Sequence, residues 1–171
     1  MAAFTLVELL VVISIIALLL GIIVPSYFSI QKKAKVTKAK VAVKNLETAF
    51  KAYLDNYRTW PAGITWPTES DAEGMEIKGD LFRMLRGEDQ PPGANPDHLS
   101  FYEFESTNSD AGALDPWSDP NDTTKGTWEC YRVKVDRDYD NKIQGIYRSV
   151  LVWSDGPDRT NGTSDDVKSW D

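Results

Sequence analysis

Residues 4–23 read FTLVELLVVISIIALLLGII, an apolar run in which Glu8 is the only charged residue. About 20 apolar residues are enough for a helix to span the hydrocarbon of a bilayer. A carboxylate inside such a segment costs a few kcal/mol unless a partner meets it, so it marks a candidate functional site. If the chain were cut before Phe4, the new α-amine of a neighbouring subunit could meet Glu8 within the membrane. The run therefore predicts a membrane helix that carries its own assembly contact.

Two other readings of this segment are a secretory signal peptide and a generic single-span anchor. A signal peptide has a basic n-region, a shorter apolar core and a small-x-small cleavage site after the core. Residues 18–25, LLLGIIVP, contain no such site. The residues alone do not exclude a generic single-span anchor.

The helical pattern continues beyond the apolar run. Residues 26–57 are largely polar, with apolar residues at intervals of three and four that lay one stripe along a helix. A single helix from about Phe4 to about Asn56 would be roughly 80 Å long at 1.5 Å per residue. Pro25 removes one backbone hydrogen bond and is expected to loosen this helix near its middle. The stripe consists of Val36, Ala39, Val43, Leu46, Phe50, Tyr53 and Tyr57.

Charge is divided unevenly along the 171 residues. Residues 1–60 contain eight basic and three acidic side chains; since the whole chain is −7 and this part is +5, residues 61–171 carry −12. The acidic part has no stripe of lysine and arginine, which argues against a nucleic-acid partner. The lysines that follow the apolar run fit an anionic lipid surface or the acidic heads of neighbouring subunits. A solvated helix face explains any single one of them equally well.

Residues suited to catalysis are scarce in this chain. Cys130 is the only cysteine, so no intrachain disulfide can form. His98 is the only histidine and lies in the turn-rich segment 87–98. The sequence has no phosphate-binding loop, no Cys/His metal spacing and no triad, and we expect that the protein is not an enzyme.

The rest of the chain predicts short helices and strands joined by long loops. Residues 78–86 read as a short helix capped by Asp80. Residues 127–135 alternate and residues 143–153 are rich in β-formers, and the polar segment 136–142 between them predicts a hairpin. The fold class is therefore α+β, with a long N-terminal helix packed on a small antiparallel sheet.

The last loop of the chain, SDGPDRTNGTSDD, concentrates acidic side chains. Carboxylates crowded in a short loop repel one another, and a hard cation relieves that repulsion. Calcium accepts six to eight oxygens from carboxylates and carbonyls in a flexible geometry. The alternative is a solvated acidic turn without a metal. The candidate ligands of this main site are Asp155, Asp158, Asp165 and Asp166.

A second acidic segment begins at Asp136 and matches the first eight positions of an EF-hand loop. Asp136, Asp138 and Asp140 stand at ligand positions 1, 3 and 5. Position 6 holds Asn141, which tolerates a left-handed conformation, in place of glycine, and position 12 holds Tyr147 in place of glutamate. The segment is thus not an EF-hand, but it could form a partial second calcium site. An ordinary polar hairpin turn explains it equally well.

The N-terminal residues resemble the signature of the type IV filament superfamily, which includes type IV pilins and pseudopilins. In that pattern a small residue precedes Phe-Thr-Leu-(Ile/Val)-Glu-Leu and an apolar helix, as Ala3, Phe4 and Glu8 do here. The resemblance implies that a prepilin peptidase cuts before Phe4 and methylates the new amine. It also assigns Glu8 and Pro25 to assembly. Two features depart from the pattern: Ala3 replaces the usual glycine, and residues 1–3 contain no lysine or arginine.

The tail resembles the calcium loop of the major pseudopilins of type II secretion. The matching features are Asp155-Gly156 after a strand, Gly162, Asp166 before a hydrophobic residue, and Trp170 near the end. Residues 115–120, DPWSDP, also resemble a segment of that family.

The resemblance implies four parts and a structural role. We expect a leader remnant at residues 1–3, a transmembrane and filament-core helix at 4–25, its amphipathic continuation at 26–57, and a globular head at 58–171. The implied protein is a subunit of a helical homo-oligomeric filament. It would work with minor pilins or pseudopilins and an assembly platform, first in the bacterial inner membrane and then in a periplasmic or surface filament. A major pilin of a surface pilus and a monomeric membrane-tethered binding protein are the alternatives to a secretion pseudopilin.

Overall fold

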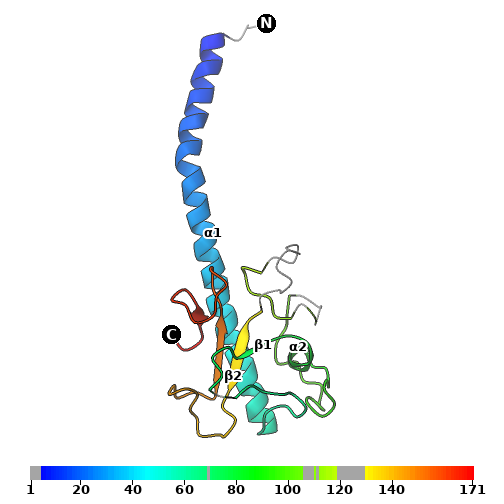
Figure 1. Cartoon of the computed structure of the whole chain (residues 1–171). Helices are drawn as coiled ribbons and strands as arrows, with labels where there is room; N and C mark the ends of the chain where they lie inside the picture. The colour runs from blue at the N-terminus through cyan, green and yellow to red at the C-terminus, as the bar shows by residue number, and fades with distance from the viewer. Residues whose placement is uncertain (1–4, 69, 106–109, 111, 119–129) are drawn as a thin grey trace. The chain divides into compact units, whose positions relative to one another are not determined.

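The computed structural model describes residues 5–171 apart from 69, 106–109, 111 and 119–129. The chain divides into two compact units, Met1–Lys35 and Val36–Asp171, which we call the N-terminal unit and the C-terminal unit. The described elements follow the order α1, β1, α2, β2, β3 and β4 (Figure 1). The predicted α+β class, a long first helix with a small antiparallel sheet, is confirmed.

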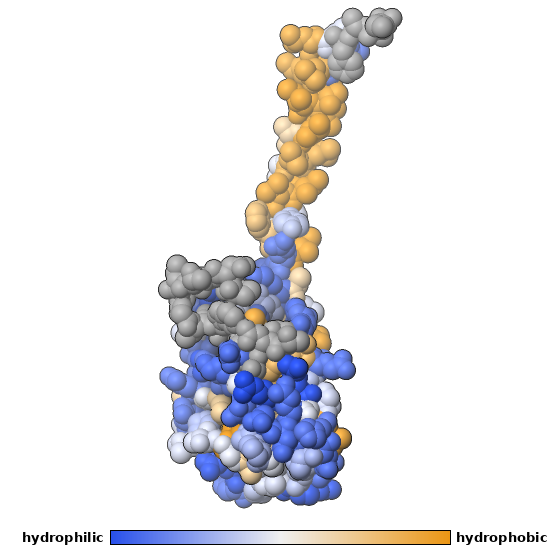
Figure 2. Space-filling view, turned by 90° about the vertical axis from the view of Figure 1, so that its right-hand side faces the viewer, coloured by the Kyte–Doolittle hydropathy of each residue, from blue (hydrophilic) through white to orange (hydrophobic). Residues whose placement is uncertain are grey.

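The N-terminal unit contains the first part of α1, which runs from Leu6 to Tyr57. The helix continues through Pro25 without a break in its assignment. Its large apolar side chains are exposed, from 45% for Val12 to 79% for Leu6. Figure 2 shows most of this part of the helix as hydrophobic surface, interrupted by a few hydrophilic residues. By length and composition, α1 is the one helix among the described residues that could cross a membrane.

In the C-terminal unit, α1 supplies one buried stripe, as the periodicity predicts. Leu46 and Phe50 are fully buried, and Tyr53 is 2% exposed. The stripe packs in one core with the sheet and with α2, since these side chains share a cluster of buried residues. Removing a buried phenylalanine side chain from such a core costs about 3–5 kcal/mol. Packing of this face is therefore what holds the second half of α1 in place.

The four strands of the sheet are neighbours in chain order, and every pair is antiparallel. Central strands β2 and β3 form the predicted hairpin, with Val133 opposite Val152 and Val135 opposite Val150. The strand bounds are β1 Met75–Glu76, β2 Arg132–Val135, β3 Val150–Ser154 and β4 Val167–Lys168.

Both predicted hairpin strands are shorter than the sequence suggested. Of the expected 143–153 strand, only residues 150–153 are regular, and β3 extends one residue further, to Ser154. The strand starts late because Ile143 and Ile146 bridge each other across a tight turn. Gln144 and Gly145 form that turn with positive φ values of 50° and 86°. Of the expected 127–135 strand, residues 127–129 lie outside the described part of the chain, and β2 begins at Arg132. A long polar connection between the hairpin strands results.

Helix α2, Asp80–Arg86, confirms the predicted short helix but corrects its cap. Gly79, with φ of 57°, occupies the N-cap position, and no side chain caps the helix there. Asp80 is the first helical residue, and its carboxylate instead pairs with Arg83 at 3.4 Å. The sequence reading failed because it did not allow a glycine with positive φ to start the helix.

Candidate functional site

Glu8, the one acidic residue of the apolar run, is held by the first turn of α1. The backbone amide and the hydroxyl of Thr5 both donate to Glu8 Oε2, at 2.9 and 2.7 Å. In return, the Glu8 amide donates to Thr5 Oγ1 at 3.2 Å. This reciprocal pattern is a capping box, in which a threonine and a glutamate three residues later satisfy free amides of a helix start. The Thr-x-x-Glu spacing carried that signal, and the sequence analysis overlooked it.

The capping box gives Glu8 a defined position within a single chain. Ala3 and Phe4, the predicted cleavage residues, lie outside the described part of the chain. Around Glu8 the helix exposes apolar side chains on every side, with Val7 at 67% and Leu9 at 56% exposure. An apolar surface of this extent marks a membrane or protein contact rather than a water-facing helix. The N-terminal unit therefore has both an apolar surface to be covered and one fixed carboxylate within it.

The tail loop, residues 155–166, follows β3 directly and begins with a buried acid. Asp155 is 7% exposed, and its Oδ2 accepts from Arg132 Nε at 2.9 Å. The other oxygen, Oδ1, is buried and has no hydrogen-bond partner in the part of the chain that the structure describes. Leaving a buried carboxylate oxygen without a partner is costly, so such an atom points to a missing ligand.

The other predicted ligands of the tail loop accept hydrogen bonds from donors within the loop. Asp165 accepts from the Thr163 hydroxyl at 2.6 Å and from the Asp158 amide at 3.1 Å. The Thr163 hydroxyl outweighs the other influences and holds the pKa of Asp165 below its usual value. Asp166 accepts from the Gly162 amide at 3.0 Å. The tail loop is thus held together by hydrogen bonds that its own amides and hydroxyl groups donate to its carboxylates.

Two further residues fix how the tail loop starts. Gly156 has a φ of 71°, and a Cβ there would lie 2.3 Å from the Asp165 carbonyl oxygen. The two ends of the loop therefore touch through their backbones. Asp115 accepts from the Ser154 hydroxyl at 2.8 Å and from the amides of Trp117 and Ser118. It ties the DPW turn to the end of β3, a role that the sequence did not reveal.

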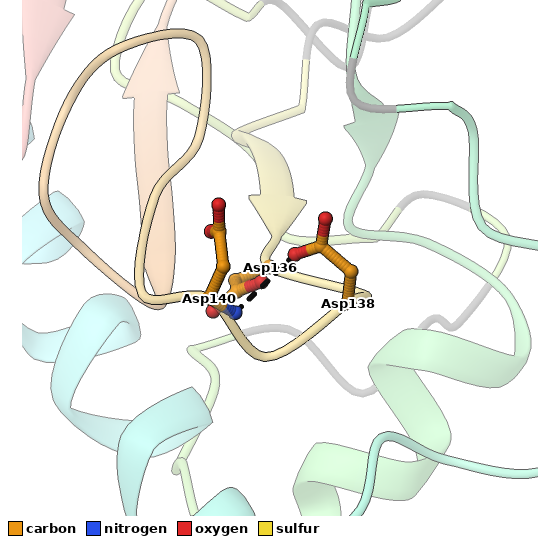
Figure 3. A group of neighbouring side chains, drawn as sticks. All are labelled: Asp136, Asp138 and Asp140. Atoms are coloured by element: carbon orange, nitrogen blue, oxygen red, sulfur yellow. Dashed lines mark hydrogen bonds between the residues drawn. The ribbon is translucent and has the colours of Figure 1, made fainter.

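The connection between β2 and β3 brings together the acids of the second predicted site. One carboxylate oxygen from each of Asp136, Asp138 and Asp140 lies within 4.8 Å of the others. Figure 3 shows Asp136 between the other two, whose side chains extend to the same side of the loop. Among the described residues, this is the group of three acidic side chains that could hold a metal ion.

Asp136 is the buried member of this group, with 2% exposure. Its Oδ2 accepts from the Asn141 amide at 2.7 Å, while its Oδ1 is buried without a hydrogen-bond partner among the residues that the structure describes. Burial raises the pKa of Asp136, and the Asp138 carboxylate adds to that effect against the opposing Asn141 amide. Asn141 has a φ of 61°, which confirms the left-handed conformation expected at this position. Tyr147 is 81% exposed and cannot complete the ligand set as a position-12 glutamate would.

The acidic loop is attached to the residues that follow α1. The Trp60 indole donates to the backbone carbonyl of Asp136. The Trp60 amide donates to the Tyr139 hydroxyl at 3.2 Å, and that hydroxyl donates to Thr59 Oγ1 at 3.3 Å. At the far end of the loop, Ile143 is fully buried. The loop is therefore held at both ends while its acidic side chains of Asp138 and Asp140 face outward.

Sequence comparisons place these features in a family. No family model and no solved structure matches the chain. Type II secretion system core protein G of Pseudomonas aeruginosa is 30% identical over 141 residues, which cover 79% of this chain and 84% of that protein. Type IV major pilin protein PilE1 of Neisseria gonorrhoeae is 32% identical over 80 residues, 44% of this chain and 48% of the pilin. A fimbrial protein of Neisseria meningitidis serogroup B is 33% identical over 82 residues, 48% of this chain and 47% of that protein. Together with the apolar first helix and the small antiparallel sheet, these relations show that the chain belongs to the type IV filament superfamily, as a structural subunit of its pilus-like filaments.

Proposed function

We propose that this subunit is the major pseudopilin of a type II protein secretion system. The observation that carries the proposal is the extent of the similarity. The relation to core protein G spans 84% of that protein, whereas the relations to the two Neisseria proteins span less than half of each. A major pilin of a surface pilus is the second candidate, because the chain is also similar to a type IV major pilin and a fimbrial protein over 80 and 82 residues. The relatives are structural proteins, and we assign the chain no catalytic step.

In this proposal the chain is inserted in the inner membrane, cut between Ala3 and Phe4 by a prepilin peptidase, and methylated on the new amine. The exposed apolar half of α1 then leaves the lipid to pack against other copies. Glu8 meets the Phe4 amine of a neighbouring subunit, which sets the register between copies. Minor pseudopilins and an assembly platform would start the filament, and the C-terminal units would lie outside the cytoplasm. Pro25 would allow the helix to adjust during packing.

A deletion strain distinguishes the two candidates. If the chain serves secretion, its loss leaves folded exoproteins in the periplasm, and a plasmid copy restores their release. If it serves a surface pilus, secretion is unchanged and surface fibres disappear. The measurement is the partition of a secreted enzyme between periplasm and medium, combined with electron microscopy of the cell surface. Normal secretion in the deletion strain would contradict the first proposal.

The tail loop fits a calcium ion in the C-terminal unit. The unpartnered buried Oδ1 of Asp155 requires a cation or donor, and the carboxylates of Asp158, Asp165 and Asp166 stand in the same loop. We assign calcium to this loop because its donors are all oxygens, which hard cations prefer. The ion would neutralise the crowded carboxylates and brace a unit that contains no intrachain disulfide.

Removing calcium should lower the melting temperature of the C-terminal unit. A ligand present at 100 times its dissociation constant stabilises a protein by about 2.7 kcal/mol. At about 2–4 °C per kcal/mol for a chain of this size, EDTA should lower the melting temperature by about 5–10 °C. The measurement is tryptophan fluorescence of the full-length protein in detergent, with and without excess calcium. The variant carrying Asp165→Asn and Asp166→Asn should lose much of this response. An unchanged melt, with no metal found by elemental analysis, would refute the calcium assignment.

A further inference from the structure

The acidic loop between β2 and β3 has an arrangement that the filament role does not require. Asp136, Asp138 and Asp140 place one oxygen each within 4.8 Å of one another at the end of β2. Acidic groups at the surface of a protein often occur without a metal, so the proximity of these three is not sufficient. The buried member of the group, Asp136, points to a ligand by its own surroundings.

The independent observation is the unpartnered Oδ1 of Asp136. This residue is 2% exposed, and its Oδ2 accepts a hydrogen bond from the Asn141 amide at 2.7 Å. Oδ1 has no partner among the described residues. Figure 3 places this carboxylate between Asp138 and Asp140, so its free oxygen belongs to the same acidic cluster. A buried carboxylate between two others is stabilised by a cation that shares their oxygens.

The surrounding hydrogen bonds keep the three carboxylates in place. The Asp140 amide donates to Asp138 Oδ1 at 3.3 Å, and the Lys142 amide donates to Asp140 Oδ1 at 2.7 Å. The ammonium of Lys142 lies over the Tyr147 ring, 5.6 Å from its centroid. The nearest lysine in sequence is thus directed to an aromatic ring. Arg137, a basic residue within the loop, donates to the Trp66 carbonyl oxygen at 3.4 Å. A cation bound from solution would supply positive charge shared by all three carboxylates.

From this arrangement we infer a second divalent-cation site, formed by Asp136, Asp138 and Asp140 and suited to calcium. The site is separate from the tail loop, which follows β3 and uses other residues. A cation here would join the start of the β2–β3 connection to its middle. Because the Asp136 carbonyl and the Tyr139 hydroxyl both bind Trp60, the same cation would fix the loop against the chain that leaves α1.

Calcium titration of the full-length protein in detergent micelles tests the site. The loop variant carries Asp138→Asn and Asp140→Asn; both residues are exposed, so the fold should persist, as near-UV circular dichroism would verify. The tail variant carries Asp165→Asn and Asp166→Asn. An Asp55→Asn variant, with an exposed acid on α1, serves as the matched control. Isothermal titration calorimetry should count one fewer calcium ion in the loop variant than in the wild-type protein and the Asp55→Asn control.

Terbium luminescence separates this site from the tail loop. In the tail variant, terbium at the Asp136 cluster should be excited through Trp60 and Tyr139, and calcium should displace it. Adding the two loop substitutions to the tail variant should reduce the signal at least roughly tenfold, since affinity in oxygen sites follows the number of charged ligands. Equal calcium stoichiometry in the loop variant and the wild-type protein, or luminescence that survives the added substitutions, would overturn the inference. Neither outcome depends on whether the protein acts in secretion or in a surface pilus.

Discussion

Glu8→Ala should abolish filament formation while the precursor remains stable in the membrane. The substitution removes the only charged residue of the apolar run, so the isolated helix becomes easier to hold in lipid by roughly 2–3 kcal/mol. It also removes the group that would neutralise the amine of an adjoining subunit, and that amine would then enter the filament core unpaired. Because the loss is repeated in every subunit, we expect filament mass to fall below detection. Electron microscopy and a shearing assay measure it.

The capping box supplies the control for this experiment. Glu8→Ala also removes the hydrogen bonds that Glu8 receives from Thr5, so part of its effect could come from a frayed helix start. Thr5→Ala removes the hydroxyl and keeps the carboxylate, at a cost of about 1 kcal/mol in helix stability. We expect Thr5→Ala to reduce filaments only modestly. Ser14→Ala, which removes a hydroxyl bonded to the Val11 carbonyl, should leave them unchanged. Wild-type filament levels in Glu8→Ala cells would contradict the assembly role.

Gly156→Ala should be among the most destabilising single substitutions in the C-terminal unit. The new Cβ would lie 2.3 Å from the Asp165 carbonyl oxygen and 2.8 Å from its carbon, and neither backbone atom can rotate away. The φ of 71° adds left-handed strain of about 1–2 kcal/mol for an alanine. With the overpacking cost of about 1–3 kcal/mol, we expect a total loss of about 2–5 kcal/mol in unfolding free energy. Urea unfolding followed by tryptophan fluorescence measures it.

Gly162→Ala is the matched control in the same loop. Gly162 has a φ of 87°, but a Cβ there would meet no atom within 4 Å. This variant therefore carries backbone strain without the clash, and its loss should be about 1–2 kcal/mol. Equal stability of the two variants would show that the ends of the tail loop are not in contact. Gly156→Ala should also weaken calcium binding, because Asp155 and Asp165 would be forced apart.

The helix and its buried face could be predicted because both depend on local pattern. A 3-4 spacing of apolar residues fixes which side chains of α1 are buried, and Leu46 and Phe50 are buried as expected. Strands β1 and β4 have two residues each, too few for a period-2 pattern, and they form only because β2 and β3 offer free edges. The start of β3 could not be predicted either, because the turn at Gln144 and Gly145 is not indicated by the alternation of apolar and polar residues.

In the candidate sites, too, features set by neighbouring residues could be predicted, whereas features set by residues far away in the chain could not. The left-handed conformation of Asn141 and the clustering of the three aspartates could be predicted from the sequence, because the loop's own hydrogen bonds set its conformation. The burial of Asp136 could not be predicted, because it depends on distant residues such as Trp60, whose indole donates to the Asp136 carbonyl from 76 residues away in the chain. The pairing of Asp155 with Arg132 likewise joins two strands and needs the sheet register.

The most direct test of the account is the mass of the N-terminal peptide from subunits inside purified filaments, coupled with the oligomeric state of the protein. We predict filaments whose subunits begin at Phe4, with a methyl group on its amine, so that this amine is available to Glu8 of another copy. A protein that stays monomeric at every concentration and still begins with Met1 would contradict the account.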